Sequence, residues 1–292
     1  MKKPHFFKVK SRIGLTNKPV RQTEFNNGVE DGAPAVLTPE FLGEFPHASL
    51  DQFIFSDPGD IVRDYYHIMV EEMVACKEFI NHRLKKGETQ IVVGGDNTVT
   101  FASLLAAQER WGDIQRNGYI QFDSHGESNS HKGSPSKNFH GMYLRPFFAA
   151  FDIPEIEALI PQKLKPSQAM FFGDMILDGD EPEFFRTMGF QTVNLAQFTA
   201  DPGTVLQALE KFLKRFDHVH VNLDVDVFHR SVAGATGIPE DGKWMKSEIF
   251  TLLKKIAQHP SVSLDISEIN PRKTGKKRTI EVAQEIVKLF AI

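Results

Sequence analysis

Cysteine, long apolar runs and an excess of basic residues are all missing from this sequence. Its 292 residues include one cysteine, Cys76, so an internal disulfide is excluded and a reducing compartment is indicated. No stretch approaches the roughly 20 apolar residues of a membrane span, and the start, "MKKPHFFKVK", has no apolar signal segment. With 34 Lys and Arg against 38 Asp and Glu, the net charge of −4 offers no general attraction to nucleic acid. We therefore expect a cytoplasmic protein that binds neither membrane nor nucleic acid.

Short apolar runs alternate with amphipathic stretches, and 41 % of the residues are hydrophobic. The apolar runs are residues 90–95, 119–123, 169–174, 192–195, 218–225 and 262–266. The amphipathic stretches are residues 100–112, 181–190, 205–216, 247–259 and 278–290. This alternation predicts an α/β fold, a central parallel β-sheet covered by helices on both faces. No linker or repeat divides the chain, so we expect one domain over residues 1–292.

Polar residues gather where the predicted strands end. In "GYIQFDSHGES", Asp123, His125 and Glu127 alternate and so lie on one face of an extended chain. Asp224 and Asp226 have the same spacing after another strand. Each pair alone would fit a helix cap or a structural hydrogen bond, but carboxylates that converge on one point repel one another unless a cation lies among them. A metal site at this edge of the sheet is the prediction.

Five motifs come in the order and spacing of a known family. They are "GGDNT", "FDSHGE", "NFHGM", "LDVDVFHRSVAGATGIP" and "DISEINP". In these motifs the chain resembles the arginase, or ureohydrolase, family over almost its whole length. The resemblance implies a three-layer, arginase-like domain that assembles as a homotrimer or homohexamer. It also implies two manganese ions and a hydroxide that attacks a guanidinium or formimino carbon.

The resemblance assigns metal ligands residue by residue. One Mn²⁺ site of the family is intact here, as Asp123, His125, Asp224 and Asp226. The other is altered, because Asn97 stands where the family has histidine and Glu127 where it has aspartate. An amide oxygen is a weaker donor than imidazole, so one firmly bound Mn²⁺ is expected and a second would bind more weakly.

The resemblance also implies how a small guanidino or formimino amino acid would bind. It assigns contacts with the substrate carboxylate to Asn129, Ser134 and Ser136. The same alignment assigns the α-amino contact to Asp178, proton transfer to His140, the guanidinium contact to Glu268 and orientation of the hydroxide to Glu127. Solvation alone would equally explain Ser134 and Ser136.

Two classes of function fit these residues. The first is metal-dependent hydrolysis of a linear amidine C–N bond, an arginase-type reaction on L-arginine or a related amino acid, with agmatinase and formimidoylglutamase types as variants. The second is a catalytically silent relative that serves as an amino-acid-binding or regulatory subunit. A zinc deacetylase on a similar sheet would need neither "GGDNT" nor "DISEINP". Two further departures bear on the pocket, Ile238 near the substrate and Lys132, whose ammonium could reach the altered metal site.

Overall fold

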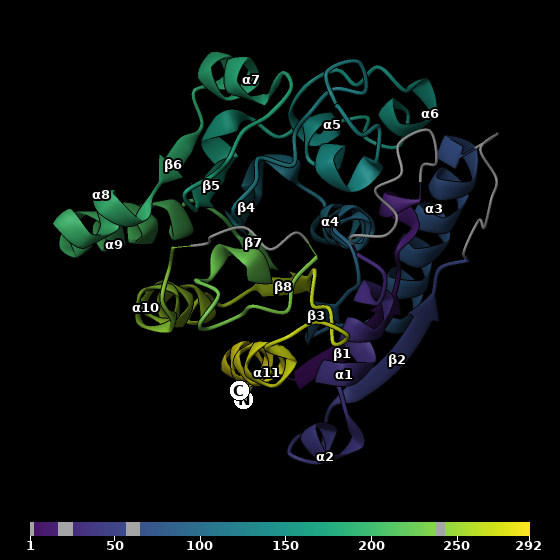
Figure 1. Cartoon of the computed structure of the whole chain (residues 1–292), viewed down its shortest axis with the longest axis vertical. Coiled ribbons are helices and arrows are strands. Elements are labelled where there is room, and N and C mark those ends of the chain that lie inside the picture. Colours follow the sequence, from purple (N-terminus) through teal and green to yellow (C-terminus); the bar gives the residue numbers. More distant parts are fainter. Residues whose placement is uncertain (1–2, 17–25, 57–64, 238–242) are drawn as a thin grey trace.

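The computed structural model describes residues 3–16, 26–56, 65–237 and 243–292, and eight strands within them form one parallel sheet (Figure 1). The strands lie in the order β2-β1-β3-β8-β7-β4-β5-β6. Their bounds are β1 Lys3–Lys10, β2 Ser49–Ile54, β3 Glu88–Val93, β4 Asn117–Phe122, β5 Ala169–Phe172, β6 Gln191–Val193, β7 His218–Asp224 and β8 Val262–Ser267. Ile238 lies outside the described residues, so its expected place near the substrate is a prediction.

Helices cover both faces of the sheet, which crosses Figure 1 diagonally from β6 to β2. One hydrophobic core packs against the first face beneath α3 (Tyr65–Arg83), α4 (Thr98–Trp111), α5 (Arg145–Phe148), α6 (Pro154–Glu157) and α7 (Glu181–Met188). A second core packs against the other face beneath α1 (Gly32–Val36), α2 (Pro39–Leu42), α8 (Leu195–Ala200), α9 (Pro202–Leu213), α10 (Lys246–Ala257) and α11 (Lys276–Ala291). The predicted three-layer α/β architecture is confirmed. None of the helices in the described ranges is long and apolar enough to cross a bilayer.

One edge of the sheet was missing from the sequence-based prediction. The two strands β1 and β2 and the helix α3 were not among the predicted elements, although β1 pairs with both β2 and β3. The sequence of β1 places charged residues at both ends of its buried run, which hides the strand pattern. Each of the six predicted apolar runs overlaps a strand of the sheet.

The central strands are apolar on one face only. On the face toward α4, alternate positions of β4, β7 and β8 are polar and buried: Tyr119, Gln121, Asp123, His218, His220, Asn222, Asp224, Ser263, Asp265 and Ser267. These side chains are hydrogen-bonded to one another, as between Ser263 Oγ and His220 Nδ1 (2.7 Å) and between His220 Nε2 and Asp265 Oδ2 (2.6 Å). A buried polar row therefore runs along the sheet and ends at its carboxyl edge.

Candidate metal centre and adjoining cavity

Four neighbouring strands, β3, β8, β7 and β4, deliver the predicted site residues at one edge of the sheet. Asp123 and His125 follow β4, while Asp224 ends β7 and Asp226 lies in the 3-10 turn Val225–Val227. Because parallel strands end at the same edge, residues about 100 positions apart in the chain become neighbours. The structure brings all four predicted ligands of the intact site together.

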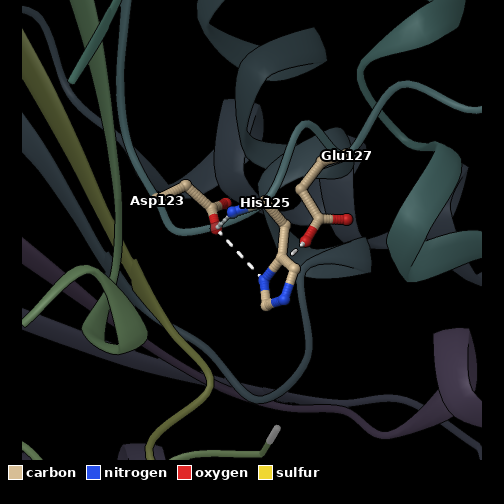
Figure 2. A group of neighbouring side chains, drawn as sticks. All are labelled: Asp123, His125 and Glu127. Carbon is tan, nitrogen blue, oxygen red and sulfur yellow. Dashed lines mark hydrogen bonds and ion pairs between the residues drawn. The ribbon is translucent and has the colours of Figure 1, made fainter. Parts of the chain in front are cut away.

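The ligand atoms of this group lie close enough to share one ion. His125 Nδ1 is 2.9 Å from Asp226 Oδ2 and 3.6 Å from Asp123 Oδ1. The ligand atoms of Asp123, Asp224 and Asp226 all lie within 4.8 Å of one another, as do those of Asp123, His125 and Glu127. Figure 2 shows the His125 ring between Asp123 and Glu127. We name these five residues, Asp123, His125, Glu127, Asp224 and Asp226, the metal centre.

Backbone hydrogen bonds hold the carboxylates in place. The amide of His125 donates to Asp123 Oδ1 at 2.8 Å, and the amide of Asp226 donates to Asp224 Oδ1 at 2.9 Å. The amide of Ser124 donates to Asp226 Oδ1 at 3.0 Å, which ties the end of β4 to the end of β7. These bonds fix the orientation of the carboxylates before any ion binds.

The electrostatics of the centre favour a cation. Burial, with the charge of Asp226, raises the pKa of Asp123 to about 7, and burial with Asp226 raises the pKa of Asp224 well above its ordinary value. Burial lowers the pKa of His125, but Asp226 and Asp123 outweigh it and leave this pKa well above the ordinary value. Carboxylates forced together in this way are stabilised by a divalent cation, and three carboxylates with one imidazole suit a hard ion such as Mn²⁺. The residues present therefore fit the metal that the sequence predicts.

Asn97 and Glu127, the two positions at which the resemblance indicates a departure, lie close together at the same edge. Asn97 Nδ2 donates to Asp224 Oδ2 at 3.0 Å and to Glu127 Oε1 at 3.4 Å, while Asn97 Oδ1 accepts from Ser267 Oγ at 2.5 Å. Asn97 thus presents its amide N–H groups, not its oxygen, to the carboxylates. Its role as a ligand would require the amide to turn over, and it stays a prediction.

Glu127 has a strained backbone and a carboxyl group that resists ionisation. Its φ of 53° is in the left-handed region, which non-glycine residues seldom adopt and which clusters at functional sites. Burial and the charge of Asp123 raise the pKa of Glu127 well above its ordinary value. Any cation at the centre would favour the ionised form of Glu127.

A cavity of about 210 Å³ adjoins the metal centre and contains the predicted amino-acid contacts. Its lining residues are His125, Glu127, Asn129, Ser134, Pro135, Ser136, His140, Gly141, Ile176, Asp178 and Glu181. Asn129 Nδ2 donates to Asp178 Oδ1 at 2.6 Å, so two of the predicted contacts also hold each other. The structure brings Asn129, Ser134, Ser136 and Asp178 to one cavity, and their contacts with a substrate stay predictions.

His140 lies in this cavity as a neutral imidazole. Burial lowers the pKa of His140 to about 4. His140 Nδ1 lies 3.2 Å from the carbonyl oxygen of Gly14, which can only accept a hydrogen bond, so Nδ1 carries the proton and donates. This bond assigns Nε2 as the unprotonated nitrogen, and Nε2 can therefore accept a proton.

Glu268 lies behind the centre, on the turn after β8, and does not line the cavity. The backbone amide of Asn97 donates to Glu268 Oε1 at 3.2 Å, and Asn26 Nδ2 donates to Oε2. Burial, together with the charge of Asp96, raises the pKa of Glu268 to about 8. Like Glu127, Glu268 has a positive φ, 64°.

Three observations correct or extend the sequence-based account of the pocket. Lys132 is exposed and does not line the cavity, so its ammonium does not take the place of a metal. Glu181 was missed, although it is buried against the cavity, accepts from the amide of Ser128 at 2.7 Å and has a pKa that burial raises to about 7. Asn26 was also missed, because only the fold brings it to Glu268.

The fold and the centre define a class: α/β proteins with a carboxylate-rich metal site at the carboxyl edge of a parallel sheet. Comparison with known families narrows this class further, since the model of the arginase family matches residues 11–292. The chain therefore belongs to the arginase family.

Individual relatives agree in fold and differ in name. The arginase of Bacillus caldovelox is 28 % identical over 249 residues, which cover 84 % of this chain and 81 % of that protein. The solved structure of Entamoeba histolytica arginase in complex with L-ornithine has a TM-score of 0.85 at 18 % identity and covers 100 % of this chain and 99 % of its own. Formimidoylglutamase from Bacillus subtilis has a TM-score of 0.70 at 17 % identity, with 100 % of this chain and 86 % of its own covered. These structures share the fold, and their range of names leaves the substrate to be argued from the site.

Proposed function

We propose that the protein hydrolyses the C–N bond of a linear amidine, with L-arginine as the leading substrate and ornithine and urea as products. The observation that carries the proposal is the metal centre lying beside a polar cavity of about 210 Å³ lined by Asn129, Asp178 and His140. A relative solved with L-ornithine supports an amino-acid product. Agmatinase and formimidoylglutamase chemistry would use the same centre with a different fit at the far end of the cavity.

The cofactor in this proposal is Mn²⁺, one ion per chain, held by Asp123, His125, Asp224 and Asp226. When bound, the ion acts as a Lewis acid that makes water a nucleophile near neutral pH. A second ion on the side of Asn97 is disfavoured, because the amide N–H groups of Asn97 already compensate Asp224 and Glu127.

The roles of the protein's own groups follow from their positions and charges. Asp178, joined to Asn129, would pair with the α-amino group of the substrate, and Ser134 and Ser136 would donate to its carboxylate. Glu127 would accept a hydrogen bond from the attacking water and so orient it.

Two more groups act on the guanidinium end. The family resemblance assigns Glu268 to the guanidinium, through a charge-assisted pair that would favour its ionised form, although Glu268 does not line the cavity. His140 would accept a proton of the attacking water at Nε2 and pass it to the nitrogen of the leaving amine, since its low pKa keeps the ring neutral at pH 7. We further propose that the protein acts in the cytoplasm as a homotrimer or homohexamer.

Release of urea tests this function directly. Protein dialysed against chelator and then given Mn²⁺ is assayed with L-arginine, agmatine, guanidinobutyrate and formiminoglutamate, the last by release of formamide. We expect turnover of L-arginine that depends on Mn²⁺ and is abolished in Asp123→Asn. The matched control is Asp217→Asn, which removes an exposed ion pair with Arg116 and should retain full activity.

The product assay, together with a binding measurement, distinguishes the enzyme from a catalytically silent relative. If calorimetry shows binding of L-arginine or L-ornithine, and none of the four amidines gives a product at saturating Mn²⁺, an amino-acid-binding role would replace hydrolysis. Turnover of formiminoglutamate alone would keep the centre and change the substrate.

A further inference from the structure

Gln121 connects the metal centre to the buried polar row of the sheet. Its side chain is fully buried on β4, two residues before Asp123, and on the same face. Gln121 Nε2 donates to Asp123 Oδ2 at 3.1 Å and to the carbonyl oxygen of His125 at 3.3 Å. One side chain therefore holds two neighbouring members of the centre.

The orientation of this amide is determined by its partners. A carboxylate accepts hydrogen bonds and cannot donate them when ionised, and a carbonyl oxygen only accepts, so Gln121 must present its NH₂ group to both. Its Oε1 then points the other way and accepts from Tyr119 Oη at 3.0 Å. Tyr143 Oη lies 3.4 Å from the same oxygen, but its single proton is shared with the nearer Asn222 Oδ1, so Tyr119 is the main donor. Both ends of the amide are satisfied in one orientation, which the phenols and the centre select together.

The phenols are themselves fixed from the neighbouring elements. Tyr143 Oη lies 3.1 Å from Tyr119 Oη and donates to Asn222 Oδ1 on β7 at 3.2 Å. Asn222 Nδ2 donates in turn to Thr100 Oγ1 on α4 at 2.9 Å. All of these side chains are fully buried, so the network is rigid and shielded from water.

Burying this many polar groups is unfavourable unless each is paired, and an apolar residue at position 121 would fill the same space without that requirement. The other face of β4 meets its packing needs with Ile120 and Phe122. Packing alone therefore does not require a polar side chain at position 121. The polar row that includes Gln121 ends in a contact with Asp123.

We propose that Gln121 is a positioning residue that sets the affinity of the metal centre for its ion, and that Tyr119 acts through Gln121. The inference rests on the proposed metal site and adds residues that the ligand set does not include. Gln121 holds Asp123 Oδ2 while the amide of His125 holds Oδ1, so that the carboxylate meets the ion in one orientation. Partners that orient ligands in this way typically change metal affinity by about 10- to 100-fold when removed.

The test measures the dissociation constant for Mn²⁺ by isothermal titration calorimetry, and by the electron paramagnetic resonance of free Mn²⁺, in full-length variants. Gln121→Met keeps the length of the side chain and removes its hydrogen bonds, and we expect affinity to fall by about 10- to 100-fold. The matched control is Gln168→Met. Gln168 is also buried, and it donates to the carbonyl oxygens of Ile114 and Asn117, neither of which contacts Gln121 or the metal centre through a hydrogen bond of this network. It should lose thermal stability and bind Mn²⁺ as the unchanged protein does.

Tyr119→Phe is a milder variant, which keeps the ring and removes the donor to Gln121 Oε1. We expect a loss of Mn²⁺ affinity of several-fold. Where Gln121→Met folds, the double variant should bind no more weakly than Gln121→Met alone, because the phenol acts through the amide. A merely structural role of Tyr119 would not produce that non-additivity.

Each result decides between the positioning role and its alternatives. Unchanged Mn²⁺ affinity in Gln121→Met, or in Tyr119→Phe where Gln121→Met does not fold, would overturn the inference while leaving the proposed function intact. Equal losses in Gln121→Met and Gln168→Met would also overturn it, by reducing the effect to general loosening. Failure of the unchanged protein to bind Mn²⁺ would overturn the inference and the metal site together.

Discussion

The metal-free protein should lose stability as the pH rises from 5 to 8, and Asp123 is one of the buried carboxyl groups responsible. Burial and Asp226 raise the pKa of Asp123 from its ordinary value of 3.8 to about 7 in the folded chain. A carboxyl group with a raised folded pKa stabilises the folded state fully below the unfolded pKa, and this stability is lost as the pH rises through the folded pKa. Between pH 5 and pH 8 the loss from Asp123 alone amounts to about 2 to 3 kcal/mol.

Neighbouring groups change this expectation in known directions. The raised pKa values of Glu127 and Asp224 act in the same sense as that of Asp123, as do those of Glu181, about 7, and Glu268, about 8. Burial lowers the pKa of His140 to about 4 and that of His218 well below its ordinary value of 6.5. These two rings oppose the fall below about pH 6.5, because there the unfolded chain binds their protons and the folded chain does not. Glu88, at the opposite end of the sheet, has its pKa lowered to about 2, because hydrogen bonds from the Lys85 amide and from His5 outweigh burial. Its contribution is complete above about pH 5 and is lost only in acid, so it does not oppose the slope between pH 5 and 8.

Thermal unfolding followed by circular dichroism measures this slope. The Tm of chelator-treated protein should fall by about 5 °C or more between pH 5 and pH 8, since about 1 kcal/mol corresponds to roughly 2–4 °C in a chain of this size. Saturating Mn²⁺ should reduce the fall, because the ion binds the ionised carboxylates of the folded state. Asp123→Asn should make the metal-free slope shallower than that of the unchanged protein. A metal-free slope that Asp123→Asn leaves unchanged would refute the assignment of a strained, buried carboxyl group to Asp123.

Three further predictions concern binding and turnover. L-Arginine should bind roughly 100-fold more tightly than agmatine, which lacks the carboxylate. This ratio corresponds to about 3 kcal/mol of charge-assisted hydrogen bonding. Equal affinities in calorimetry would exclude the amino-acid contacts of Asn129 and Ser136. Asn97→His combined with Glu127→Asp should raise the Mn²⁺ content from one to two ions per chain by elemental analysis. Each single change should raise the content by less than the pair does. A content that stays at one ion per chain would show that these two positions do not limit the second site. His140→Asn should lower kcat by about 100-fold and leave KM within a few-fold, and a change confined to KM would assign His140 to binding instead of proton transfer.

The fold, and the meeting of two acidic pairs at one edge of the sheet, could be predicted because both follow from local pattern. Apolar runs that alternate with amphipathic stretches define a parallel α/β sheet, and the i, i+2 spacing of Asp123 with His125, and of Asp224 with Asp226, places each pair on one face whatever surrounds it. The edge strand β2 was hidden because its burial alternates between intermediate and exposed, so half of its residues are polar or solvent-facing.

Features that depend on contacts between distant elements could not be predicted. The polar row beneath α4 is carried by residues such as His220 and Gln121 whose partners lie on other strands, and the sequence offers no local reason for their burial. Asn26 meets Glu268 across 242 positions of the chain. The amide of Asn97 turns its nitrogen toward Asp224 because Ser267 Oγ occupies its oxygen, a choice that only the assembled site determines.

The most direct test of the account is the anomalous scattering of manganese in crystals grown with Mn²⁺. The account predicts one strong peak per chain in contact with Asp123, His125, Asp224 and Asp226, with Gln121 still donating to Asp123 and the NH₂ group of Asn97 facing Asp224. Crystals that diffract well and show no peak at these four residues, or show manganese only elsewhere, would contradict the metal centre and the hydrolytic function built on it.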